Sequence, residues 1–327
     1  MRSGTKKTML SMAGILLMVL FMTAGMGRTT FAAYIPYPSF TVEAVQTDAT
    51  ANSITVGWQA KDAGYYNVEI KDISLPYEQQ QWVPVASGLT QNSVVIPGLV
   101  SGSEYYVRVT AVSAADPSRT DVSSVNEAKT LISTMRNVHV AEYYHFIQTV
   151  HVDWDQLRAA DGYEYTFSNY KGKVINKGTL AGRTDTISIN KLKTETIYTF
   201  AIRGYMQFNG QVIYTPWEKI NVFEQAWVKS AVKKNGKLTI SWNPVKGATG
   251  YDIYVSSNEK TGYKKVKSVG AKKRSITIKK VGKTKINKKK NWNVYVITKK
   301  KNDRSGVVYF WSSKENGRSY HYIDKSR

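Results

Sequence analysis

The 327-residue chain contains no cysteine, only four histidines and no long apolar run after its first 33 residues. Without cysteine it can form no disulfide, thiolate-ligated zinc site, iron–sulfur cluster or thiol nucleophile. The sequence also contains no nucleophile elbow, phosphate-binding glycine loop, calcium loop or zinc-ligand spacing. We therefore predict a protein that is not an enzyme and that holds no cofactor or metal.

Three of the histidines recur every six residues, at His139, His145 and His151. In one continuous strand this spacing would place them on one face, as a metal cluster requires. The residues between them do not read as one strand, so we predict solvent-facing histidines instead. Asp153 and Asp155 are expected to point to solvent as well, without the cleft that paired carboxylates need for glycoside hydrolysis.

Residues 1–33 predict a secretory signal peptide. A basic start is followed by a stretch without charge from Thr8 to Gly27, and Thr30-Phe31-Ala32 offers small side chains at a cleavage site. An uncleaved signal anchor is the alternative, because the uncharged stretch is long enough to span a bilayer. We favour cleavage, since glycines dilute the stretch. The expected product is secreted and has no membrane span; it is either soluble outside the cell or held at the cell wall by contacts.

One pattern occurs three times in the chain. Trp58, Trp154 and Trp242 lie in matching alternating strands, at intervals of 96 and 88 residues. A short loop ending in Gly-Tyr follows each tryptophan, at Gly64-Tyr65, Gly162-Tyr163 and Gly250-Tyr251. No long stretch after residue 33 shows helical periodicity. Short alternating strands between turn residues predict β-sandwiches rather than βαβ units.

Roughly forty residues beyond each tryptophan stands an aliphatic residue, which is Leu99, Leu192 or Val281. In the first two copies a tyrosine follows six residues later, at Tyr105 and Tyr198, and opens another alternating run. The third copy has Asn287 at that spacing, and its aromatic residue comes only at Trp292. We predict a loop lengthened by about five residues, with Trp292 near the position of the missing tyrosine.

The tryptophan and the leucine-to-tyrosine spacing resemble those of fibronectin type III domains. In that family the tyrosine forms a tyrosine corner, which ties its strand to the preceding crossover. Residues 242–254 resemble the versions found in secreted Gram-positive bacterial proteins. The resemblance covers almost all of residues 38–315 and implies an all-β chain of three tandem immunoglobulin-like (fibronectin type III) β-sandwiches after the signal peptide.

The expected organisation has five parts with short connections near residues 130–133 and 221–224. They are a signal peptide at 1–33, fibronectin type III-like domains at 38–132 and 133–223, a basic fibronectin type III-like domain at 225–315, and a basic tail at 316–327. Neither connection is rich in glycine, serine or proline, so we expect limited flexibility between the domains.

Charge is segregated along the chain. The 46 basic and 24 acidic residues give a net charge of +22, but residues 34–132 carry −5, residues 133–223 carry +2 and residues 224–327 carry +21. In the last segment lysine outnumbers arginine by 23 to four. Lysine acts as a point charge, whereas arginine makes the bidentate contacts of specific recognition. A repetitive polyanion is therefore a better match for this segment than one defined ligand.

The topology of the resembled family implies that three loops of the third domain share one end. These loops carry Lys233, Lys234, Lys237, Lys260, Lys264, Lys265, Lys283, Lys285, Lys288, Lys289 and Lys290. The tail is expected to add Lys314, Arg318, Lys325 and Arg327 at that end, while Lys299, Lys300 and Lys301 lie at the opposite end. We predict salt-sensitive association of these lysines with an anionic polymer, such as teichoic acid or another polyanionic glycan.

Two other interpretations compete with polymer binding. A charged surface can simply be solvated, with no partner. Alternatively, the protein is a carbohydrate-binding accessory of an extracellular polysaccharide-degrading system, with exposed aromatic rings stacked on sugars; the candidates are Trp82, Trp217, Trp311, Tyr320 and Tyr322. Nucleic acid is disfavoured, because the basic segment has no recognisable nucleic-acid fold and the chain is expected to be exported. The leading expectation is an exported binding or scaffold protein.

Overall fold

The computed structural model describes residues 34–144, 147–223, 226–287, 289–305, 307–312 and 317–324, the last two ranges by their backbone only. The predicted signal peptide lies outside the described residues, as do His145, Lys288, Lys314, Lys325 and Arg327. Among the described residues, no helix is long and apolar enough to cross a membrane. The helix described is one 3₁₀ turn, η1 (Tyr77–Gln79).

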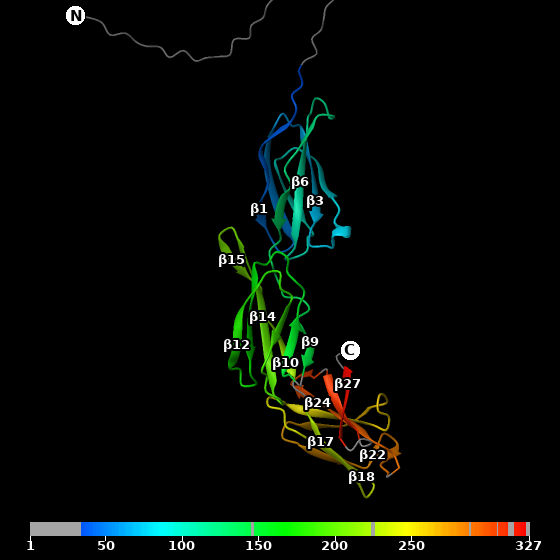
Figure 1. The fold of residues 1–327 in the computed structure, drawn as a ribbon. Helices are drawn as coiled ribbons and strands as arrows, with labels where there is room; N and C mark the ends of the chain where they lie inside the picture. The colour runs from blue at the N-terminus through cyan, green and yellow to red at the C-terminus, as the bar shows by residue number, and fades with distance from the viewer. Residues whose placement is uncertain are drawn as a thin grey trace, which may run out of the picture. The chain divides into compact units, whose positions relative to one another are not determined.

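The first domain is a sandwich of two antiparallel sheets, shown in blue to green-cyan in Figure 1. One sheet has the order β1-β2-β5, and the other has the order β4-β3-β6-β7 with β8 also paired to β6. The strands are β1 (Ser39–Ala49), β2 (Ser53–Lys61), β3 (Tyr65–Asp72), β4 (Val83–Leu89), β5 (Ser93–Pro97), β6 (Glu104–Val112), β7 (Thr120–Val122) and β8 (Asn126–Lys129).

The second domain repeats this order. Its sheets are β13-β10-β9 and β12-β11-β14-β15, with β16 also paired to β14. The strands are β9 (His139–Tyr144), β10 (Thr149–Asp153), β11 (Gly162–Ser168), β12 (Val174–Ala181), β13 (Thr186–Ile189), β14 (Ile197–Phe208), β15 (Gln211–Tyr214) and β16 (Glu218–Phe223).

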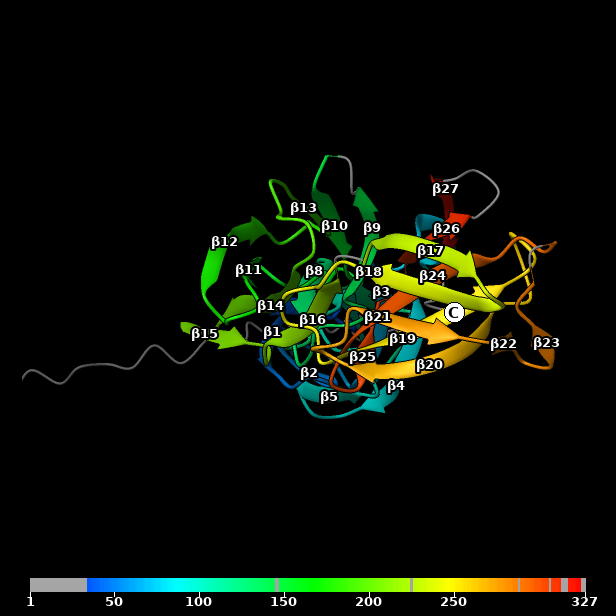
Figure 2. The ribbon, with the colours of Figure 1, turned by 90° about the horizontal axis from the view of Figure 1, so that it is seen from below.

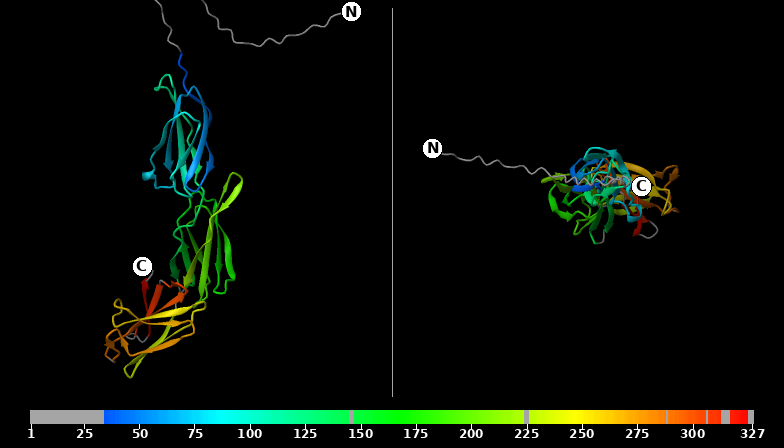
Figure 3. Two further views of the ribbon diagram at one scale, coloured as in Figure 1. Left: turned by 180° about the vertical axis from the view of Figure 1, so that it is seen from behind. Right: turned by 90° about the horizontal axis from the view of Figure 1, so that it is seen from above.

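The third domain, yellow to red in Figures 2 and 3, has the sheets β17-β18-β21 and β20-β19-β24-β26-β27. Strand β25 also pairs with β24, and β22 forms a small hairpin with β23. The strands are β17 (Val228–Lys234), β18 (Lys237–Trp242), β19 (Gly250–Ser256), β20 (Lys264–Gly270), β21 (Ser275–Ile278), β22 (Lys280–Val281), β23 (Thr284–Lys285), β24 (Asn293–Lys300), β25 (Asp303–Arg304), β26 (Val307–Ser312) and β27 (Gly317–Asp324). The predicted all-β sandwich fold is confirmed.

Each sandwich has its own buried apolar core, and the predicted tryptophans Trp58, Trp154 and Trp242 are buried in these three cores. A tyrosine of the next strand packs edge-on against each indole, with ring centroids 5.3, 5.5 and 5.6 Å apart. Edge-to-face packing is a favoured geometry for aromatic pairs. The repeated sequence pattern therefore corresponds to a tryptophan–tyrosine contact that is repeated in each core.

The first copy departs from the predicted alignment by one residue. The tyrosine that contacts Trp58 is Tyr66, which is buried, and not Tyr65, which follows Gly64. In the other two copies the tyrosine directly after the glycine makes this contact. The loop after the tryptophan is thus one residue shorter in the first domain, and the Gly-Tyr pair of that copy is offset by one residue from the pairs of the other two copies.

The tyrosine corners predicted from the family resemblance are confirmed in the first two domains. The Tyr105 hydroxyl accepts a hydrogen bond from the Val100 backbone N–H at 2.9 Å. The Tyr198 hydroxyl accepts one from the Lys193 backbone N–H at 2.7 Å. Each bond ties the start of the long central strand to the crossover before it.

Tyr105→Phe is expected to lower the free energy of unfolding of the first domain by about 1–2 kcal/mol, because it leaves the Val100 N–H without its acceptor. Urea unfolding of the chain measures this change. Tyr106→Phe on the same strand is the matched control and should shift stability by less than about 0.5 kcal/mol. Equal effects of both substitutions would contradict the tyrosine-corner assignment.

Strand register places Trp292 at the position of the corner tyrosines, as predicted. Tyr66 pairs with Ala111, Tyr163 with Gly204 and Tyr251 with Thr298. Tyr105, Tyr198 and Trp292 each stand six residues before these partners. Trp292 is buried in the third core, so an indole replaces the phenol ring at this position.

The carboxyl-terminal segment differs from the predicted tail. Residues Gly317–Asp324 form β27, which pairs antiparallel with β26 and extends the sheet of the third domain. Asp324 pairs with Val307, whereas Ser312, at the other end of β26, pairs with Asn293 and Gly317. The chain therefore runs back toward the opposite end of the domain after Arg318, while the predicted positions of Lys314, Lys325 and Arg327 lie outside the described residues.

Candidate functional site

The predicted basic loops of the third domain lie together at one end of its sandwich (Figure 2). They are the turn between β17 and β18, the loop between β19 and β20, and the connection from β21 to β24. We call this surface the lysine end; its described members are Lys233, Lys234, Lys237, Lys260, Lys264, Lys265, Lys283, Lys285, Lys289 and Lys290.

Direct contacts join the three loops. The Lys233 ammonium donates to the Lys290 backbone carbonyl at 2.8 Å, which links the β17–β18 turn to the β21–β24 connection. A Cβ added to Gly282 would lie 3.0 Å from the Lys264 Nζ, so the β19–β20 loop also reaches that connection. Gly282 has a φ of +57°, a region that glycine enters without steric cost. Sequence positions up to 57 residues apart thus form one surface.

Few carboxylates neutralise the lysine end. Lys265 lies 3.9 Å from Asp252. Lys234, Lys260 and Lys283 are exposed and make no ion pair with any residue that the structure describes. Ammonium groups gathered without counter-charges create a positive potential that attracts anions and is screened by salt. The surface can therefore hold a polyanion by several weak contacts.

Asp252 on β19 is a buried carboxylate of the third domain. Its oxygens lie 3.1 Å from the Lys299 ammonium and 3.9 Å from that of Lys265. Burial alone would raise the pKa of the Asp252 carboxyl, but the Ser268 hydroxyl and the two ammonium groups outweigh burial and hold the pKa below its usual value. Asp252 thus stays ionised and attracts the ammonium groups of Lys299 and Lys265.

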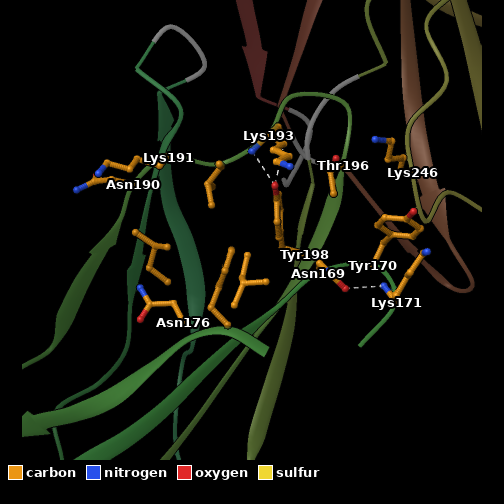
Figure 4. A pocket seen from close by; sticks show the side chains of 14 residues that line it. Asn169, Tyr170, Lys171, Asn176, Asn190, Lys191, Lys193, Thr196, Tyr198 and Lys246 are labelled. Atoms are coloured by element: carbon orange, nitrogen blue, oxygen red, sulfur yellow. Dashed lines mark hydrogen bonds between the residues drawn. The ribbon is translucent and has the colours of Figure 1, made fainter. Parts of the chain in front are cut away.

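A pocket in the second domain was not predicted from the sequence (Figure 4). It has a volume of about 610 Å³ and opens between the β11–β12 turn and the connection from β13 to β14. Its floor is apolar and its rim is basic. The lining comprises Phe167, Asn169, Tyr170, Lys171, Ile175, Asn176, Ile189, Asn190, Lys191, Leu192, Lys193, Thr196, Tyr198 and Lys246. We call it the second-domain pocket.

Backbone hydrogen bonds bring Lys246 of the third domain to the rim of this pocket. The Lys246 N–H donates to the Glu195 carbonyl at 2.8 Å, and the Ile197 N–H donates to the Lys246 carbonyl at 2.9 Å. Ile197 is fully buried in the apolar core of the third domain. The fourth lysine of the rim is thus held by the packing between consecutive domains.

Sequence reasoning missed the second-domain pocket because its residues come from separate stretches and none belongs to the repeated core pattern except Leu192 and Tyr198. The net charge of the second domain, only +2, also hid the local excess of lysine. Lys191 and Lys193 flank the aliphatic marker Leu192, and that alternation is the signal that could have drawn attention to this edge.

Two of the tryptophans proposed for sugar stacking are engaged by cations of their own domains. The Arg108 guanidinium lies 4.3 Å from the Trp82 ring centroid, and that of Arg203 lies 4.8 Å from the Trp217 centroid. Both arginines also pair with a glutamate of the neighbouring strand. Each arginine therefore occupies one face of its indole ring. The side chains of Trp311, Tyr320 and Tyr322 lie outside the described residues.

The described histidines do not form a metal site. His139 is exposed, while His151 is partly buried and packs edge-on against Tyr144 at a centroid distance of 5.2 Å. Within the described ranges, no three histidine, aspartate or glutamate side chains gather closely enough to hold a metal ion.

Comparison with known proteins agrees with this architecture. The strand order defines an all-β protein of immunoglobulin-like sandwiches. The family model of the fibronectin type III domain matches residues 38–123, so the chain contains a fibronectin type III domain. No curated protein matches the chain.

Two solved structures are similar to the chain over much of its length. The FN1–FN3 domains of chicken CNTN1 share 13% identity, with 88% of this chain and 97% of that chain covered and a TM-score of 0.33. A two-domain fibronectin type III segment of chicken tenascin shares 15% identity, with 56% and 99% covered and a TM-score of 0.32.

Proposed function

We propose that this protein is an exported, non-enzymatic binding or scaffold protein of a Gram-positive bacterium, whose lysine end associates with anionic cell-wall or extracellular polymers. The observation that supports the proposal is the convergence of three lysine-bearing loops at one end of the third domain. Exposed lysines that pair with no carboxylate in the described part of the chain, such as Lys234, Lys260 and Lys283, can exchange small counter-ions for a polyanion.

The repetitive character of the surface favours a repetitive partner. Its ammonium groups lie on long, flexible side chains and offer no preformed fork for one ligand. Teichoic acids and other polyanionic glycans present regularly spaced charges that such a surface can follow. Binding is therefore expected to depend more on the density of charge than on the identity of a single unit.

Sedimentation of residues 34–327 with purified Gram-positive cell walls, across a salt series, tests the proposal. The protein should pellet at low salt and be released as salt rises. The variant Lys264→Gln/Lys283→Gln/Lys285→Gln should bind at least about tenfold more weakly, since each lysine near an anionic surface contributes up to about 1 kcal/mol before screening.

A matched variant separates the lysine end from net charge. Lys173→Gln/Lys177→Gln/Lys219→Gln removes the same charge from exposed positions of the second domain and should bind walls as the unaltered chain does. Equal loss in both variants would show that net charge alone governs binding. A chain that stays in solution at every salt concentration would refute wall binding.

A further inference from the structure

We propose that the second-domain pocket binds one anionic sugar unit, meaning a sugar ring that carries a carboxylate or a phosphate. The pocket is separate from the lysine end and would recognise a single unit rather than a run of charges. Its volume of about 610 Å³ lies within the range of pockets that enclose small ligands.

The positive charge around the pocket favours an anionic ligand. Four lysines, Lys171, Lys191, Lys193 and Lys246, line it together with no aspartate or glutamate. None of the four makes an ion pair with a described residue. Figure 4 shows these lysines and three asparagines distributed around the opening. A ligand in the pocket would therefore meet positive charge from several directions.

The polar groups of the wall add hydrogen-bond donors. The Asn169 side-chain oxygen accepts hydrogen bonds from the backbone N–H groups of Lys171 and Lys173, at 2.9 and 3.2 Å. The Asn190 oxygen accepts one from the Thr149 hydroxyl at 2.9 Å. Because these oxygens are occupied, the amide NH₂ groups are the parts left to donate to a ligand. Hydroxyl and acid oxygens of a sugar are suitable acceptors.

The floor of the pocket suits the C–H face of a sugar ring. The apolar surface that it exposes comes from Ile175 and Tyr170, which are 50% and 37% exposed and lie over the buried side chains of Phe167, Ile189 and Leu192. An aromatic ring beside polar groups presents an apolar face to a pyranose while leaving its hydroxyls free. A simple inorganic anion would leave this apolar surface uncovered, whereas a sugar acid covers both parts of the pocket.

The walls are held in place before any ligand binds. The Tyr198 hydroxyl fixes the backbone of Lys193 through the tyrosine corner. A Cβ added to Gly247 would lie only 2.7 Å from the Tyr170 Cβ, so the third-domain loop packs tightly against the base of that ring. Preorganised walls reduce the ordering cost of binding.

Isothermal titration of residues 34–327 with glucuronic acid, glucose 6-phosphate and glucose at low ionic strength tests the proposal. We expect binding of at least one of the two acids and none of glucose; which acid binds distinguishes a carboxylate from a phosphate source. Lys191→Gln/Lys193→Gln should weaken the binding about tenfold, because it removes two of the four ammonium groups that line the pocket.

The control double variant is Lys173→Gln/Lys177→Gln, which removes two exposed lysines of the same sheet edge that do not line the pocket. It should bind the acids unchanged, and thermal unfolding should show both variants folded. Equal binding of glucose, equal weakening in both variants, or no binding of either acid would each overturn the proposal. None of these results depends on wall sedimentation, so the two proposals fail separately.

Discussion

Trp242→Ala is expected to unfold the third domain at moderate temperature while the first two domains stay folded. Trp242 is 1% exposed and packs edge-on against Tyr251 at 5.6 Å. Truncating a buried tryptophan costs about 3–5 kcal/mol through lost transfer free energy and the remaining cavity. A small domain has a total stability of only about 5–15 kcal/mol, so this loss is a large fraction of it.

The separation of the three cores explains why the loss should stay local. Trp58 and Trp154 belong to different buried clusters from Trp242. Ile197 begins β14 of the second domain but packs in the third core, so unfolding of the third domain should lower the stability of the second by a smaller amount.

Limited trypsin digestion measures this prediction, because the third domain is rich in cleavage sites. The Trp242→Ala chain should lose its third domain quickly and leave a resistant fragment of the first two domains. Trp217→Ala is the matched control: this indole is 36% exposed, so its removal should cost less than about 1 kcal/mol and leave the digestion pattern intact. Simultaneous digestion of all three domains would show that their folding is coupled.

The fold could be read from the sequence because its signals are local or strictly periodic. The tryptophans, the alternating runs and the leucine-to-tyrosine spacing each indicate a strand with one buried face. Because the pattern occurs three times, each copy supports the interpretation of the others. Even the irregular third copy was interpretable: Trp292 takes the register position of Tyr105 and Tyr198 although its loop is longer.

The errors came where the sequence signal was ambiguous. Tyr65 and Tyr66 are adjacent tyrosines, and only packing against Trp58 shows which one faces the core. The basic composition after position 315 suggested a tail, yet Gly317–Asp324 extend a sheet as β27. A strand-forming pattern at a chain end is easily taken for a tail when charge dominates its composition.

One of the two candidate sites could be predicted from the sequence, and the other could not. The lysine end was predicted from composition and family topology, since its loops carry many lysines. The second-domain pocket depends on positions such as Lys171 and Lys246, which are far apart in sequence. The backbone hydrogen bonds that Lys246 makes with Glu195 and Ile197 place it at the pocket. Contacts of this kind exist only in the folded chain, so the sequence alone did not predict them.

Asp252→Asn is expected to lower the free energy of unfolding of the third domain by about 2 kcal/mol at pH 7, because it removes the charge that Lys299 and Ser268 stabilise. Asp252 pairs in register with Ile297 and Ser268, so asparagine fits the same space without its charge. Asp303→Asn is the matched control: this exposed side chain accepts hydrogen bonds from Asn221 and from the Arg304 N–H, asparagine keeps an acceptor oxygen there, and stability should change by less than about 1 kcal/mol.

The effect of Asp252→Asn should depend on pH in a defined direction. The folded-state pKa of Asp252 lies below its usual value, so the ionised carboxyl contributes its full stabilisation above the unfolded-state pKa of about 3.9. That contribution is lost as the pH falls below this value and through the folded-state pKa. Urea unfolding at pH 7 and at pH 2.5 should therefore show a large difference between the unaltered chain and Asp252→Asn at pH 7, and a smaller one at pH 2.5. A difference that is the same at both pH values would mean that packing, and not the charge of Asp252, stabilises this part of the sheet.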